Sequence, residues 1–94
     1  MSLENDAERG RLAEAVLDNP VYRESFDLIE QGLIRAWRDC RDKAEREDLH
    51  KLLRMLDKTR NTLESTMRSG KVAAEDLRQK QGIAQRVLRR FEPA

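Results

Sequence analysis

The chain has 94 residues, of which 38% are hydrophobic and 39% charged, and its formal net charge is +1. One Trp, one Tyr and two Phe are too few for a sheet built on aromatic residues, so this composition predicts long amphipathic helices. The near-zero net charge excludes polyanion binding through bulk charge, and the single Cys40 excludes an internal disulfide.

The first residues of the chain are polar and acidic, with no basic segment followed by an apolar one, so we expect no export signal. No apolar run approaches the roughly 18 residues that a membrane-spanning helix needs. The sequence therefore predicts a cytoplasmic protein without a membrane partner.

Charge is divided unevenly along the chain. Residues 1–30 hold eight acidic and three basic side chains, a net of −5, whereas residues 68–91 hold seven basic and two acidic ones, a net of +5. Such a chain can pair its own ends, pair head to tail with a copy, or offer two faces to two partners. Plain solvation of these charges is an equally good interpretation, because surface ion pairs contribute little to stability.

Two helices are predicted in the first part of the chain. The first spans residues 6–17 and directs Leu12, Ala13, Val16 and Leu17 toward a core. The second spans residues 20–39, with Asn19 as its cap and Pro20 at its first position, where the missing N–H costs nothing. Its apolar face follows spacings of three and four through Tyr22, Phe26, Ile29, Leu33, Ala36, Trp37 and Cys40.

A polar connection from Arg38 to Arg46 leads into the strongest helical pattern, residues 44–68. Leucines recur there every seven residues, at 49, 56 and 63. The intervening heptad positions are filled by Leu52 or Leu53, by Thr59 or Arg60, and by Met67. A helix with one narrow apolar stripe needs a partner, so we predict a long antiparallel hairpin of helices 20–39 and 44–68.

The tripeptide Ser69-Gly70-Lys71 predicts the end of this third helix, since glycine favours the left-handed residue after a helix. A basic fourth helix is predicted over residues 72–91, and a break at Gly82 within it stays open. The fold class is thus all-α: residues 1–94 form a single helical domain that we expect to be oligomeric.

Residues that would indicate catalysis are missing. One histidine, one cysteine and no clustered glycines provide no metal-ligand spacing, no nucleophile with its base and no phosphate loop. We therefore predict no enzyme, no cofactor, no metal and no small-molecule substrate. His50 is expected on the surface and Cys40 as a small buried hydrophobe, while the hydroxyl of Tyr22 is expected at solvent.

Two sets of residues are candidates for binding. The first would contact a copy of the chain or another protein, and Trp37 belongs to it because tryptophan is frequent at binding hot spots, although closing the core is the favoured role of this residue. The set is Trp37, Leu49, Leu53, Leu56, Leu63 and Met67. The second set is basic and would contact an acidic protein or nucleic acid. It consists of Arg78, Lys80, Arg86, Arg89 and Arg90.

Residues 12–77 resemble a group of short all-helical proteins of tailed bacteriophages and prophages, which are mostly uncharacterised. The matching features are Asn19-Pro20, Phe26, Trp37, the Glu45 to Leu53 entry into the long helix, Leu56-Asp57 and Gly70-Lys71. The resemblance implies a phage context, hence the host-cell cytoplasm or the virion, but it contains no active-site motif.

These observations favour a non-catalytic interaction or assembly protein that presents helix faces to protein partners and to copies of itself. The alternative is a small nucleic-acid-binding or packaging protein that uses the basic helix 72–91. Nearly absent aromatic side chains in that helix count against the alternative, because Phe91 alone makes no stacking platform.

Overall fold

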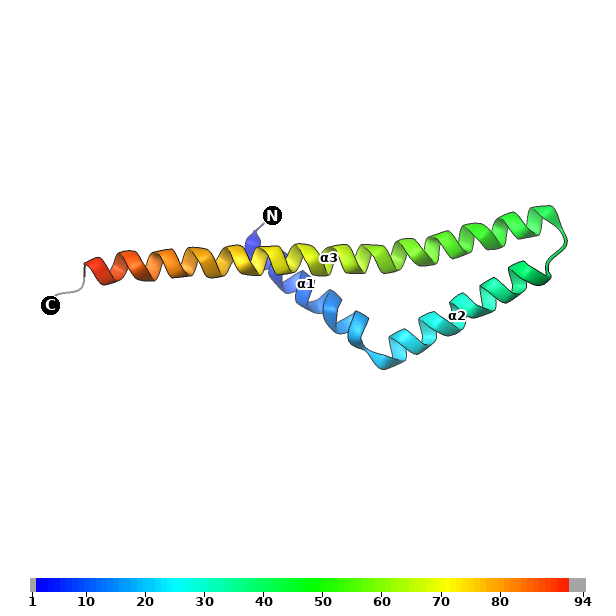
Figure 1. The fold of residues 1–94 in the computed structure, drawn as a ribbon, viewed down its shortest axis with the longest axis horizontal. Coiled ribbons are helices and arrows are strands. Elements are labelled where there is room, and N and C mark those ends of the chain that lie inside the picture. Colours follow the sequence, from blue (N-terminus) through cyan, green and yellow to red (C-terminus); the bar gives the residue numbers. More distant parts are fainter. Residues whose placement is uncertain (1, 92–94) are drawn as a thin grey trace.

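The computed structural model describes residues 2–91, and all its regular structure is helical (Figure 1). Helix α1 spans Leu3–Asp18, α2 spans Pro20–Asp39 and α3 spans Lys43–Arg90. The predicted all-α class is confirmed.

The molecule is long and flat. Its principal extents are 80 × 24 × 15 Å and its radius of gyration is 21.7 Å, against about 12 Å for a compact chain of this length. Helices α1 and α2 form a V whose elbow points away from α3, and both run antiparallel to α3 (Figure 1). The described residues therefore form two helical layers side by side, and no third element among them covers the broad faces.

Side-chain caps define the start of each helix. The side chain of Ser2 accepts a hydrogen bond from the Asn5 amide, so α1 begins three residues earlier than predicted. Asn19 accepts from the amides of residues 21 and 22, and α2 has the predicted bounds. Asp42 caps α3, which shortens the predicted polar connection to residues 40–42.

The predicted division of the last part of the chain into two helices is wrong. Helix α3 is continuous for 48 residues, about 72 Å, and passes through both Gly70 and Gly82. No glycine among the described residues has a positive φ. Gly70 therefore does not end a helix, and its lack of a side chain serves the packing of α1 instead.

The buried core is small. Its hydrophobic members are Ala13, Phe26 and Ala73, and none of the described side chains is completely buried. In α1 the predicted inward residue Leu12 is instead 53% exposed, and Val16 is exposed as well, because Gly10 and Ala13 form the face turned to α3. The chain thus leaves many large hydrophobic side chains at its surface.

Candidate interaction surfaces

Helices α1 and α3 cross at a pair of glycines. A Cβ atom on Gly10 would lie 3.1 Å from the carbonyl oxygen of Thr66, and one on Gly70 would lie 3.0 Å from that of Asp6. Each would also collide with the Cα atom of the opposite glycine. Because Asp6 and Thr66 each precede their glycine by four residues, the crossing is locally two-fold symmetric. Backbones meet directly here, which only glycine permits.

The predicted apolar stripe of α3 is turned toward the other two helices. Its five members, Leu49, Leu53, Leu56, Leu63 and Met67, are all half-buried, whereas Leu52 beside them is exposed. The residues predicted to bind a partner are therefore partly covered by the chain itself. Whether they also contact another protein stays a prediction.

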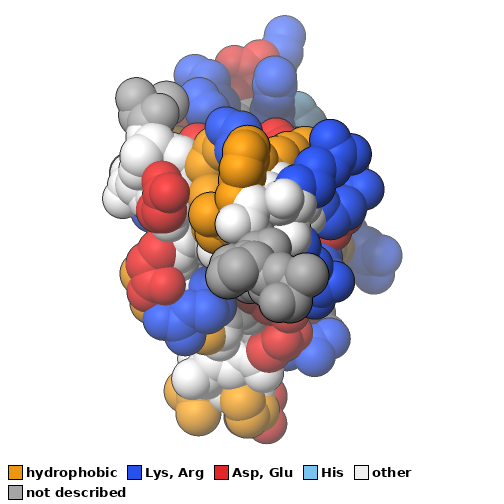
Figure 2. Space-filling model, turned by 90° about the vertical axis from the view of Figure 1, so that its left-hand side faces the viewer, with side chains coloured by type: hydrophobic (Ala, Val, Ile, Leu, Met, Phe, Trp, Pro, Cys, Tyr) orange, Lys and Arg blue, Asp and Glu red, His pale blue; other side chains and the backbone are white. Residues whose placement is uncertain are grey.

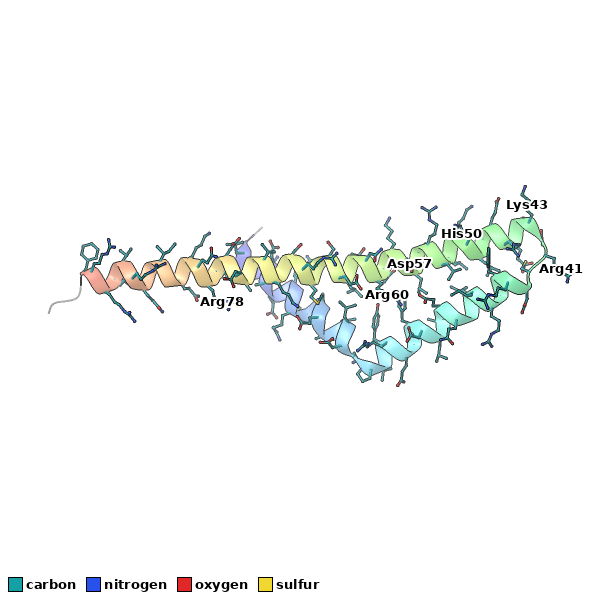
Figure 3. The ribbon with its side chains drawn as sticks, in the orientation of Figure 1. Arg41, Lys43, His50, Asp57, Arg60 and Arg78 are labelled. Carbon is teal, nitrogen blue, oxygen red and sulfur yellow. The ribbon has the colours of Figure 1, made fainter. Side chains whose placement is uncertain are left out.

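Arg60 occupies one polar position within this stripe. Its guanidinium lies over the ring of Phe26, 4.1 Å from the ring centroid, and 3.4 Å from a carboxylate oxygen of Glu30. The carboxylate of Asp27 lies 4.0 Å away. Figure 3 shows Arg60 on the side of α3 that faces α2. Ring contact and paired charges together allow an arginine between apolar neighbours.

A cleft of about 570 Å³ lies between α3 and the junction of α1 with α2. Tyr22, Phe26 and Leu17 line it from one side, and Arg60 and Met67 from α3. The hydroxyl of Tyr22 is buried and has no hydrogen-bond partner, so its predicted position at solvent is wrong. The ring of Tyr22 packs beside that of Phe26, with 5.8 Å between centroids.

The loop end of the molecule carries Trp37 and Cys40. The guanidinium of Arg46 lies 4.3 Å from the centroid of the Trp37 ring and donates a hydrogen bond to the carbonyl oxygen of Cys40. Trp37 stays 36% exposed, so it closes this end only partly. Cys40 is half-buried, with its thiol 3.5 Å from the Asp42 carbonyl oxygen, and His50 is exposed.

Beyond Leu77, α3 continues past α1 to Arg90 (Figure 1). This helical segment from residue 78, together with its C-cap Phe91, is here named the overhang. Phe91 is 79% exposed, and Ile83, Val87 and Leu88 are exposed too. In Figure 2, which looks onto this end, hydrophobic side chains lie beside a side rich in Lys and Arg. The overhang is therefore an amphipathic helix that has no partner among residues 2–91.

The predicted basic residues lie on the overhang and are all exposed. At 100° per residue, the four arginines occupy an arc of about 120°, and Lys80 lies on another side of the helix. Arg78 pairs with Glu75 on its own helix, and Lys71 lies 3.9 Å from Glu14 of α1. The arginines form one basic side, and Lys80 does not belong to it.

Charge pairing elsewhere is local and exposed. In α1, the hydrogen bond from Arg11 to Glu8 lowers the pKa of the carboxyl group and raises the pKa of the guanidinium. Within residues 2–91, no three His, Cys, Asp or Glu side chains gather as a metal ion would require. No helix of this described part is both long and apolar enough to cross a membrane.

Comparison of the chain with protein-family models, with curated proteins and with solved structures found no match.

Sequence reasoning missed the glycine crossing, although a signal is present. Gly10-Arg11-Leu12-Ala13 and Gly70-Lys71-Val72-Ala73 have the same pattern, and a leucine follows each glycine after seven residues. Matching short segments of this kind indicate two helices that pack through equivalent faces. The pairing of such faces was not predicted, because Gly70 was interpreted as the end of a helix.

Proposed function

We propose that this chain is a non-catalytic helical interaction and assembly protein, which associates with copies of itself and presents helix faces to protein partners. The phage context, with a place in the host-cell cytoplasm or the virion, is part of the proposal and comes from the resemblance of residues 12–77. An extended, all-helical chain with a small core supports this function better than a catalytic one.

The observation that carries the proposal is that the chain exposes more surface than a compact monomer of its mass would. The chain exposes 7957 Å², whereas a compact monomer of 11.0 kDa exposes about 5,600 Å². The difference, roughly 2,300 Å² per chain, lies within the range of about 1,000 to 2,500 Å² that each partner hides in a large permanent interface. Exposed leucine, isoleucine, valine and methionine side chains contribute to it, and their burial would be favourable.

Sedimentation equilibrium of the purified chain tests this proposal. At tens of micromolar we expect a mass of at least twice 11.0 kDa. A mass of one chain up to about 200 μM would contradict self-association, and the chain would then need a different protein to cover its apolar surface.

One observation favours a second function. The arginines at 78, 86, 89 and 90 lie on one side of the overhang, where they could follow the phosphates of a nucleic acid. This function predicts binding to duplex DNA at about 50 mM salt that is strongly weakened at about 200 mM, because each phosphate contact releases counterions.

Replacing Arg86, Arg89 and Arg90 by glutamate separates the two functions, since glutamate forms helix about as well as arginine. The nucleic-acid function predicts loss of DNA binding with retained helix content. If the unmodified chain binds no DNA at low salt, this second function is wrong, and the same substitutions then report only on an acidic protein partner.

A further inference from the structure

The apolar stripe of α3 continues onto the overhang. Counted every seventh residue from Leu49, it passes positions 56, 63, 70 and 77, all of which are half-buried or buried. The next two positions are Ala84 and Phe91, which are exposed. Val87 and Leu88 beside them are exposed as well. The overhang therefore presents the continuation of the face that α3 turns to α1, but nothing within residues 2–91 covers it.

The stripe already accepts a helix of its own kind. Residues 3–17 of α1 and 63–77 of α3 lie sixty positions apart and share the same degree of burial at every position except the fourth residue of the chain and its counterpart at 64. The identical pairs are Leu3 and Leu63, Glu4 and Glu64, Gly10 and Gly70, Ala13 and Ala73, and Leu17 and Leu77. These segments cross through equivalent contacts on both sides. A second α3 therefore fits the uncovered part of the stripe.

The overhang ends where a second copy offers opposite charge. Glu4 and Glu8, in the first turns of α1, line one shallow cleft with Leu77. Two overhangs of equal length, packed antiparallel, would each end beside these carboxylates in the other copy. The end of the overhang carries Arg89 and Arg90, and residues 78–91 hold no acidic side chain. Opposite charges thus meet at both ends of the pair.

The arginines of the overhang do not oppose this pairing. At 100° per residue, the centre of the arginine arc lies about 150° from the centre of the apolar arc. Lys80 lies within the apolar arc, four residues before Ala84. In a pair centred on Ala84, the two copies of Lys80 would lie about 12 Å apart along the helices, beyond the Debye length of about 8 Å at physiological salt.

Nucleic acid explains this surface less completely. Phosphates attract the arginines of the overhang, but they give no cover to Val87, Leu88 and Phe91 on the other side of the helix. A paired helix buries these apolar side chains and leaves the arginines at solvent, except at the ends of the pair.

We infer that two copies of this chain pair through their overhangs, antiparallel and about a two-fold axis near Ala84. This inference rests on the proposed self-association and specifies its geometry. The same apolar face meets itself across the axis. Because the overhang extends away from α1 and α2, the paired segments overlap by about 21 Å at one end of each molecule (Figure 1). Two chains of 80 Å would thus form a rod of about 140 Å.

Small-angle X-ray scattering tests this geometry on the unmodified chain. Where sedimentation shows a dimer, we expect a maximum dimension of about 140 Å. A dimer packed side by side would stay close to the 80 Å of one chain, which would overturn the inference and leave self-association intact. A chain that is monomeric up to about 200 μM would refute both, whether or not its overhang binds duplex DNA or anionic vesicles.

Leu88→Glu provides a second test, with Gln85→Glu as its matched control. Both substitutions add one negative charge to the overhang, but Leu88 lies within the apolar arc and Gln85 about 130° from its centre. We expect Leu88→Glu to weaken association roughly 100-fold, because the two-fold axis buries an unpaired carboxylate in each copy. Gln85→Glu should associate as the unmodified chain does. If both variants associate equally tightly, the interface lies elsewhere and the inference is wrong.

Circular dichroism checks that the two variants stay folded. Helix content should be nearly the same in both, because the crossing of α1 with α3 at Gly10 and Gly70 does not involve the overhang.

Discussion

At the scale of single residues, four glycines have different roles. Gly10 and Gly70 are buried where two backbones touch, whereas Gly32 and Gly82 have open space around the position of a Cβ atom. The glycines in the long helix therefore provide a matched pair, because 70 and 82 lie on the same element but in opposite environments.

We predict that Gly70→Ala destabilises the chain by about 1–3 kcal/mol, since the added methyl group meets backbone that cannot move without separating α1 from α3. Gly82→Ala should instead stabilise it by about 0.5–1 kcal/mol through helix propensity alone. Chemical denaturation of both variants at one protein concentration measures the difference. Equal stability of the two would show that the glycine crossing is not present in solution.

At the scale of elements, the sequence predicts both bounds of α2 but not the continuity of α3. Asn19 and Pro20 determine the start of α2 through local chemistry, and its bounds were predicted correctly. The end assigned at Gly70 was wrong, because a glycine flanked by polar residues looks the same whether it caps a helix or contacts another helix. Which of the two applies depends on α1, sixty residues away in sequence, and local patterns carry no such information.

Among the candidate surfaces, those formed by one helix were also predicted better than those formed by several helices. The half-buried stripe of Leu49, Leu56 and Leu63 was predicted from its heptad spacing. The cleft lined by Leu17, Tyr22 and Met67 was not, because its residues come from three helices that lie side by side only in the folded chain.

At the scale of the whole molecule, the three helices of the described residues lie in two layers and bury only a small core. The radius of gyration of 21.7 Å and the exposed overhang both describe a chain that folds against itself along only part of its length. We therefore propose that a second copy of the chain completes the folded state.

The concentration dependence of thermal unfolding tests this claim most directly, because unfolding that separates two chains becomes harder as concentration rises. Between about 2 and 200 μM, we predict that the unfolding midpoint of the unmodified chain rises by roughly 7 °C, from the entropy of unfolding typical of two chains of this length. A midpoint that stays the same over this hundredfold range would mean that the single chain is the complete folding unit, and it would contradict the account.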